Sequence, residues 1–302
     1  MYTVPDQTGR TVVVTGANSG TGREAAKRLT AAGARVILAV RNPEKGADAL
    51  AEVLATRPDA QAEVRILDLA DLASVRAFAD DLLTDLDHLD TLVNNAGVMV
   101  PPQRHQTADG HELQWGTNFL GPFALTNLLL PLLLAAPAPR VATMSSGAAN
   151  GGRIDFDDLD WERRPYRAWP AYQQSKLADL HLAQHLAQLA RRRDWALVST
   201  AAHPGFTRTN LQVTGPNMGR ERRAGWTPLS LIPSMAPPEG AGSILLAAAD
   251  PAVEPGAYYG PRFGLVGKPG PARLNRRMRD AAEAARLWSV AEDITSTTVP
   301  AR

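Results

Sequence analysis

Short apolar runs alternate along the chain with longer stretches in which apolar residues recur at the spacing of a helix. The runs that predict strands are residues 11–15, 35–40, 64–67, 89–93, 140–144, 196–201 and 258–259. The stretches that predict helices are residues 20–32, 43–55, 72–86, 118–134, 172–192, 239–249 and 273–290. Strands that alternate with helices are typical of βαβ units. The pattern predicts an α/β fold in a single domain over residues 1–302, a Rossmann-like, doubly wound parallel sheet of about seven strands with helices on both faces.

Residues 203–238 interrupt this pattern, because they are rich in proline and glycine and show little periodicity. A loop of this length inside a compact domain is usually functional. Since it follows the carboxyl end of a predicted strand, we expect it to be a substrate-binding loop or lid. Its apolar residues either form a roof over a hydrophobic substrate or pack within the loop: Trp226, Leu229, Leu231, Ile232 and Met235.

Composition narrows the classes of protein that fit. The 32 lysines and arginines nearly balance the 31 acidic residues, so no nucleic-acid partner is expected. The absence of cysteine excludes disulfides, thiolate catalysis and cysteine-based metal sites. No uninterrupted apolar run approaches the roughly 18 residues of a membrane span, and the N-terminus lacks the layout of a secretory signal. We therefore expect a cytoplasmic protein without membrane insertion.

A glycine-rich turn joins the first predicted strand to its helix, with the sequence Thr-Gly-Ala-Asn-Ser-Gly-Thr-Gly at residues 15–22. Glycines at such a turn let the backbone approach a pyrophosphate, and the helix N-terminus supplies N–H donors. The turn could instead be only a tight connection, but its place between a strand and a helix favours a phosphate site. The predicted cofactor-binding residues here are Gly16, Asn18, Ser19, Gly20, Thr21 and Gly22.

The end of the second predicted strand indicates which cofactor is bound. Folds that prefer NAD place an acidic residue there, about 20 residues beyond the glycines, to hold the ribose hydroxyls. This chain has Arg41 and no carboxylate, and a guanidinium can bind a 2′-phosphate. We therefore predict NADP rather than NAD, although Arg41 could instead pair with Glu44. Arg23 could add a second positive charge, and Asp68, followed by Leu69, could accept a hydrogen bond from the adenine amino group.

Tyr172 and Lys176 place a phenol and an ammonium four residues apart, on one face of a predicted helix. A nearby cation favours the phenolate, so such a tyrosine can exchange protons with a substrate oxygen. Taken alone this spacing is weak evidence, but polar residues at other strand ends support it. Those residues are Ser145 and Ser146 after the fifth predicted strand, Asn94, Asn95, Ala96 and Gly97 after the fourth, and Asn118, which could cap the apolar helix or hold a water in a proton path.

These motifs, in this order, resemble the classical short-chain dehydrogenase/reductase family over nearly the whole chain. Within the family the chain is similar to retinol dehydrogenases, the WW-domain-containing oxidoreductase and protochlorophyllide reductase. The segments that carry the closer similarity are residues 39–45, 107–112, 116–121, 155–159, 172–178 and 256–261. The chain shows no N-terminal membrane helix like that of retinol dehydrogenases, which disfavours a membrane-delivered retinoid.

The resemblance implies a role for each matching residue. Tyr172 is expected to be the general acid/base, and Lys176 to hold the nicotinamide ribose and lower the pKa of the tyrosine. Ser146, rather than Ser145, stands at the usual distance before the tyrosine, and Asn118 is expected to link the lysine to solvent through water. The implied cofactor contacts are Asn95, Ala96, Gly97, Tyr172, Lys176, Pro204, Gly205 and Thr207 or Thr209.

Some residues depart from the family or suggest other chemistry. Thr21 stands where isoleucine or leucine is usual, and Asp179 stands where the nearest subgroup carries asparagine. His181 and His185 have a spacing that could bind a metal, but no further ligand joins them. We expect no metal and place this pair on a solvated or interface face. His203 either touches substrate or is a packed loop histidine.

The sequence thus predicts an NADP-dependent oxidoreductase that reduces a carbonyl, or oxidises an alcohol, of a small apolar substrate. An NADP-binding regulatory or scaffold protein of the same fold is the alternative from another class. A sugar-nucleotide epimerase is a third possibility, disfavoured because too little chain follows the sixth predicted strand. The resemblance also suggests a homodimer or homotetramer formed through the long helices, but the C-terminal helix could block that contact.

Overall fold

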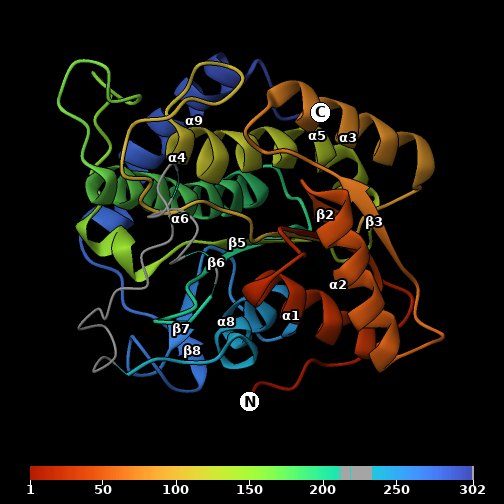
Figure 1. The fold of residues 1–302 in the computed structure, drawn as a ribbon. Coiled ribbons are helices and arrows are strands. Elements are labelled where there is room, and N and C mark those ends of the chain that lie inside the picture. Colours follow the sequence, from red (N-terminus) through yellow and green to blue (C-terminus); the bar gives the residue numbers. More distant parts are fainter. Residues whose placement is uncertain (210, 212–217, 219–232, 301–302) are drawn as a thin grey trace.

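The computed structural model describes residues 1–209, 211, 218 and 233–300, and they form one sheet with helices on both sides (Figure 1). The sheet has eight strands in the order β3-β2-β1-β4-β5-β6-β7-β8. Strands β1 to β7 pair in parallel, and β8 joins the edge antiparallel to β7. The strands are β1 Thr11–Thr15, β2 Arg35–Val40, β3 Ala62–Ile66, β4 Thr91–Asn94, β5 Arg140–Met144, β6 Val198–Ala202, β7 Tyr258–Pro261 and β8 Pro269–Pro271. The predicted doubly wound α/β fold is confirmed.

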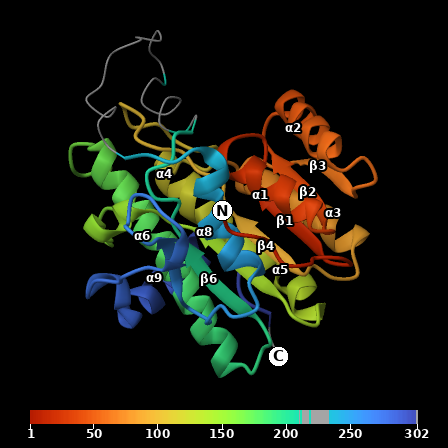
Figure 2. The same ribbon diagram turned by 90° about the horizontal axis from the view of Figure 1, so that it is seen from below.

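The helices divide between the two faces of the sheet, as Figures 1 and 2 show. One face carries α1 Gly20–Ala31, α2 Pro43–Thr56 and α8 Pro237–Ala249, and the other carries α3 Leu72–Asp85, α5 Gly121–Ala135, α6 Ala168–Arg192 and α9 Ala281–Thr295. Successive strand side chains point to opposite faces, so Val12 and Val14 enter one core and Val13 the other. The near-continuous apolar strands are therefore explained by burial on both sides.

The last helix begins later than its pattern predicts. The predicted span was residues 273–290, whereas α9 runs from Ala281 to Thr295. The carboxylate of Asp280 accepts hydrogen bonds from the N–H groups of Ala282 and Glu283, which starts the helix there. The residues before it form strand β8 and a short 3-10 helix, Arg277–Arg279. Strand β8 was not predicted, because it has three residues and two of them are prolines.

The apolar helix predicted from residue 118 begins five residues earlier. Helix α4 Leu113–Trp115 leads into a π-helical segment, η1 Gly116–Leu120, which continues into α5. Asn118 therefore lies inside a continuous helical run, and the prediction that it caps a helix is wrong. The start belongs to Glu112, whose carboxylate accepts a hydrogen bond from the N–H of Trp115.

This helical run is also the one segment, among the residues that the structure describes, with the length and hydropathy of a membrane span. The segment is Leu113–Ala135, and 78% of its most apolar window is buried inside the fold. Such burial is typical of the core helix of a globular protein. The absence of membrane insertion stays a prediction.

The topology places a crevice at the carboxyl ends of the central strands. From β1 the chain builds outward to β2 and β3, then returns to β4 on the other side of β1. Loops that leave β1 and β4 in opposite directions open a crevice at this switch point, where doubly wound sheets bind their ligands. Of the predicted lid over residues 203–238, Trp226, Leu229, Leu231 and Ile232 lie outside the described residues, while Met235 is buried and pairs with Thr207.

Candidate active site

The turn that follows β1 requires glycine for its backbone conformation and its packing. Gly16 and Gly20 have φ angles of +67° and +56°, in the left-handed region that other residues avoid. A Cβ on Gly16 would lie 2.9 Å from the Cα of Ala96, and a Cβ on Gly22 would collide with the carbonyl oxygen of Gly16. The turn therefore brings bare backbone against the segment that follows β4.

Helix α1 begins at this turn with an N-terminus that no side chain in the described part of the chain caps. The N-cap residue Ser19 makes no capping hydrogen bond, and the first turn of α1 contains no acidic residue. The positive end of the helix and its N–H groups can therefore act on a bound anion. The predicted pyrophosphate of a dinucleotide fits this position.

Asn95 fastens the glycine turn to the end of β4. Its Nδ2 donates to the carbonyl oxygen of Thr15, and its N–H donates to the Thr15 hydroxyl, both at 3.0 Å. Thr21 donates to Asn95 Oδ1 at 2.9 Å. The threonine that departs from the family pattern therefore joins the two halves of the crevice through its hydroxyl, and Asn95 braces the strand ends.

Arg41 is available for an anion at the end of β2. It is exposed, and it forms no ion pair or hydrogen bond with any residue in the described part of the chain, so the alternative pairing with Glu44 is absent there. Arg23, by contrast, donates to Glu52 at 2.6 Å, which neutralises the second positive charge expected here. After the neighbouring strand β3, the Asp68 carboxylate accepts from the N–H of Ala70 at 2.9 Å, and Leu69 is buried.

Helix α6 presents Tyr172 and Lys176 toward the carboxyl end of β5. Lys176 is buried, and its Nζ donates to the carbonyl oxygen of Met144 at 3.0 Å and to Oδ2 of Asp179 at 2.7 Å. Burial alone would lower the pKa of Lys176, but the negative charges of Asp179 and Tyr172 outweigh it and raise that pKa. The ammonium is therefore held charged, one helical turn from the phenol.

The two serines at the end of β5 have different roles. The hydroxyl of Ser145 is buried and donates to the backbone carbonyl oxygen of Lys176 at 2.6 Å. Ser146 is only half-buried, and its hydroxyl accepts from the N–H of Ala148 at 3.1 Å, so its own proton stays available to a ligand. The geometry favours Ser146 over Ser145 as the residue that faces a substrate.

Asn118 binds the segment that follows β4. Its Oδ1 accepts from the N–H of Val98 at 2.7 Å, and its Nδ2 donates to the carbonyl oxygen of Val98 and the hydroxyl of Ser175. A Cβ on Gly97 would lie 3.0 Å from Asn118 Oδ1 and 3.5 Å from Lys176 Nζ. Gly97 therefore lies between the asparagine and the lysine, and a side chain at this position would crowd both of them.

The residues after β6 lie beside the same crevice. The hydroxyl of Thr207 donates to the carbonyl oxygen of Pro204 at 2.6 Å, and the side chain of Thr209 lies about 3.2 Å from where a Cβ on Gly20 would be. Pro204 and Gly205 are half-buried. The chain after β6 therefore reaches the glycine turn, although most of the lid lies outside the described residues.

The three histidines that the sequence singled out, His181, His185 and His203, are packed inside the fold. The ring of His203 packs 5.1 Å from the ring of Tyr258, and burial lowers the pKa of His203 to about 4, so it is a packed loop histidine. His181 and His185 were expected on a solvated or interface face, and this is wrong: both are buried beneath α9. His181 lies 3.0 Å from a carboxylate oxygen of Glu283, and the ring of His185 lies 5.1 Å from that of Trp288. Among the described residues, no group of three potential metal ligands occurs.

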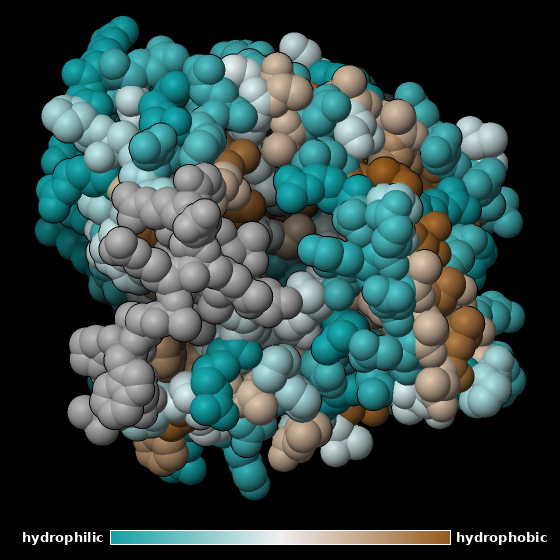
Figure 3. Space-filling model, in the orientation of Figure 1, coloured by the Kyte–Doolittle hydropathy of each residue, from teal (hydrophilic) through white to brown (hydrophobic). Residues whose placement is uncertain are grey.

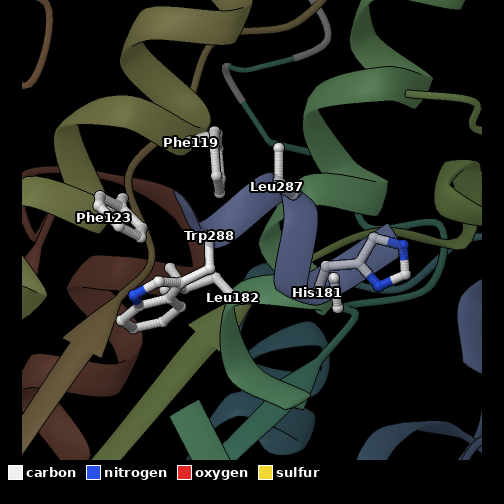
Figure 4. A pocket seen from close by; sticks show the side chains of 7 residues that line it. Phe119, Phe123, His181, Leu182, Leu287 and Trp288 are labelled. Carbon is white, nitrogen blue, oxygen red and sulfur yellow. The ribbon is translucent and has the colours of Figure 1, made fainter. Parts of the chain in front are cut away.

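A small pocket lies between α9 and the helices that it covers (Figure 4). About 140 Å³ of space, part of it open to solvent, lies between its side chains, and none of this space is wide enough for a water molecule. The lining residues are Phe119, Phe123, His181, Leu182, Ala284, Leu287 and Trp288. This space is a packing defect at a helix–helix contact.

Three residues of the site were not predicted for the roles they have. Tyr258 donates to the backbone carbonyl oxygen of Ser146 at 2.9 Å, which fixes the serine segment. Trp169 packs on Tyr172, and Asp179 pairs with Lys176. The helical spacing of Trp169 and Asp179 from the Tyr–Lys pair, three residues in each case, was the signal that could have placed them on the same face.

The fold and the site together are those of a doubly wound α/β domain with a glycine-rich turn and a Tyr–Lys pair at one edge of its sheet. A family model described as short chain dehydrogenase matches residues 10–217. The chain is 43% identical to human retinol dehydrogenase 13 over 203 residues, which are 67% of this chain and 60% of that protein. It is 38% identical to mouse retinol dehydrogenase 14 over 94% of this chain and 85% of that one. The match to the first of these relatives spans less than two thirds of that relative's length.

Solved structures agree with these similarities. An uncharacterised protein from Mycobacterium paratuberculosis superposes with a TM-score of 0.81 at 41% identity, over 99% of this chain and 97% of the other. A short chain dehydrogenase from Shigella flexneri, solved in complex with NADP, gives a TM-score of 0.64 at 27% identity, over 86% and 99%. The chain belongs to the short-chain dehydrogenase/reductase family, in its retinol dehydrogenase-like subgroup.

Proposed function

We propose that the chain is an NADP-dependent oxidoreductase that reduces a carbonyl, or oxidises an alcohol, on an apolar substrate. The observation that carries this proposal is a buried Lys176 that interacts with Tyr172 and lies beside Gly97, at the end of β5 that Ser146 follows. If the glycine turn were only a tight connection between β1 and α1, the glycines alone would be sufficient. Such a turn would need neither a buried lysine beside a tyrosine nor a serine whose hydroxyl proton is available.

The bound nicotinamide would supply or accept the hydride. Ser146 would donate its hydroxyl proton in a hydrogen bond to the substrate oxygen and hold it against the phenol. Tyr172 would give its proton to that oxygen in reduction, and would take a proton from the alcohol in oxidation. The charged ammonium of Lys176 would stabilise the phenolate of Tyr172, which is the product of the proton transfer in reduction and the base in oxidation.

Arg41 supports NADP as the cofactor. Its exposed guanidinium has no partner among the described residues, and the end of β2 has no carboxylate that would repel a 2′-phosphate. The Shigella flexneri relative was solved with NADP, which is in keeping with this choice.

Trp169 supports an apolar substrate. It lies in the first turn of α6, three residues before Tyr172, and is 50% exposed. Figure 3 shows apolar residues within a hollow near the centre of the face it draws, with hydrophilic residues along the right-hand border of the hollow. Two of the relatives are named for retinol, an apolar alcohol, and these names are in keeping with an apolar substrate for this chain.

The test is consumption of NADPH by the purified protein with a panel of apolar aldehydes and ketones, with NADH in parallel. We expect turnover with NADPH that is lost in Tyr172→Phe, while this variant still binds NADPH, because only the proton donor is removed. Activity above a few per cent in the variant would contradict the assigned mechanism. Tight NADPH binding without turnover in either direction would instead favour a binding protein of this fold.

A further inference from the structure

Asp179 is a buried acid in direct contact with the lysine of the proposed site. It follows Lys176 by three residues on α6, and its Oδ2 accepts from Nζ at 2.7 Å. The side chains of Lys176 and Asp179 are 5% and 1% exposed.

The surroundings of Asp179 do not explain the charge by themselves. Burial of a carboxylate is unfavourable unless it is paired and hydrogen-bonded. Among the described residues, Oδ1 of Asp179 is buried and has no hydrogen-bond partner. Its single ion-pair partner there is Lys176. The carboxylate therefore acts on the lysine and makes no other hydrogen bond or ion pair among these residues that would stabilise helix α6.

We propose that Asp179 is the counter-ion and positioning residue of Lys176, which anchors the ammonium beneath Gly97 and offsets part of its charge as felt by Tyr172. This inference rests on the proposed function, because Lys176 is assigned there as the cation that acts on the phenol.

The charges support this role. Burial raises the pKa of Asp179 to about 7, against the opposing effect of Lys176. The charge and hydrogen bond of Asp179 in turn raise the pKa of Lys176 despite its burial. The carboxylate is therefore ionised in mildly alkaline solution and neutral in mildly acidic solution, and its influence on its neighbours changes between them.

Few other titratable groups face the pair. On α6 itself Tyr172 interacts with Lys176, while His181 points away to Glu283 of α9. Tyr258 of β7 interacts with Tyr172, and burial raises its pKa, so it stays neutral. His203 at the end of β6 is also neutral, because burial lowers its pKa to about 4. Every polar side chain of η1, α5 and β4 is uncharged, and that of Asn118 reaches α6 at the Ser175 hydroxyl.

Removal of this anion should make both neighbours lose their protons at lower pH. A negative charge favours the protonated form of every nearby group, so Asp179→Asn should shift the ionisation of Tyr172 and of Lys176 in the same direction. The substitution removes the negative charge but keeps an oxygen, that of the amide, which can accept a hydrogen bond from Lys176 Nζ. A variant that merely disturbed the packing would not move two pH limbs together.

The experiment combines an optical titration with a rate profile. Ultraviolet difference titration of tyrosinate, with Tyr172→Phe subtracted, follows the Tyr172 phenol without any turnover. Interference is small, because the pKa of each of the other four tyrosines is raised: Tyr2, Tyr166, Tyr258 and Tyr259. In parallel, kcat/KM for oxidation of an apolar alcohol with NADP⁺ is measured against pH. Asp81→Asn, an exposed site on α3, is the matched control.

We expect Asp179→Asn to move the Tyr172 midpoint to lower pH by about one unit. The acidic limb of the rate profile should move with it, and an alkaline limb from Lys176 should enter the measured range. Below about pH 6 the two proteins should behave alike, because Asp179 is then neutral in the wild type. Asp81→Asn should change nothing. If Asp179→Asn does not fold, Asp179→Ser makes the same test, since it also removes the charge.

An unmoved Tyr172 midpoint in a folded variant would overturn the proposal, even if the protein turns over substrate. A shifted midpoint in a protein with no turnover would support the role of Asp179 and contradict the proposed function. The two failures are therefore distinguishable.

Discussion

The ring of Trp169 lies 5.7 Å from the ring of Tyr172, centroid to centroid, while half of the tryptophan surface remains exposed. The tyrosine is 5% exposed, so the indole covers the approach to its ring. A large aromatic side chain that is half exposed beside a proposed proton donor is well placed to contact the substrate.

Trp169→Ala should therefore raise KM for apolar substrates. An aromatic contact contributes about 0.5–1.5 kcal/mol beyond the area that it buries, so we expect a rise of about twofold to twelvefold. Binding of NADPH, measured by fluorescence, should be unchanged. Leu83→Ala, at an exposed apolar site on α3, is the control. An equal KM in Trp169→Ala and wild type would place the substrate elsewhere.

Arg41→Asp should change the cofactor preference from NADPH toward NADH. Charge-assisted hydrogen bonds contribute about 1.5–3 kcal/mol, which corresponds to a loss of about tenfold to a hundredfold in NADPH affinity. Arg23→Ala should have a much smaller effect, because Arg23 is already paired with Glu52. The dissociation constants of both cofactors, measured by calorimetry for the two variants, check this prediction. If the preference stays the same in Arg41→Asp, other residues hold the 2′-phosphate.

Acid should destabilise the fold through two buried histidines. Burial lowers the pKa of His203 to about 4, and burial, together with the charges of Arg192 and His181, does the same for His185. A histidine whose pKa is lower in the folded state binds fewer protons there than in the unfolded state. Its contribution to stability is complete above the unfolded pKa of about 6.5 and is lost as the pH falls through the folded value.

We expect His203→Asn to remove part of this loss. Between about pH 7.5 and pH 4.5 the stability of the variant relative to wild type should improve by about 1–3 kcal/mol. Urea unfolding at the two pH values measures the difference, and His88→Asn, at a partly exposed position, serves as the comparison. A constant difference between the variant and wild type would mean that His203 is protonated in the folded protein.

The sequence was sufficient for features that depend on local spacing. Period and turn residues predicted the parallel strands, and the four-residue spacing of Tyr172 and Lys176 predicted that they share a face. The features that were missed depend on contacts between distant elements. The burial of His181 is decided by where α9 docks, and the charge of Asp179 acquires its role only from the burial of Lys176. Strand β8 exists because β7 offers an edge, since its own prolines argue against it.

Helix α9 also bears on the oligomeric state. Assembly through the long helices would require the outer face of α6, but α9 lies on it: Glu283 contacts His181, and the ring of Trp288 lies 4.8 Å from that of Phe123 on α5. We therefore expect a monomer in solution, near the chain mass of 32.3 kDa by light scattering. Trp288→Asp should displace α9, because it places a charge in an apolar contact, and the uncovered face should then associate. Asp293→Ala, at an exposed position on the same helix, should stay monomeric. A wild-type dimer that Trp288→Asp leaves intact would show that another surface carries the assembly.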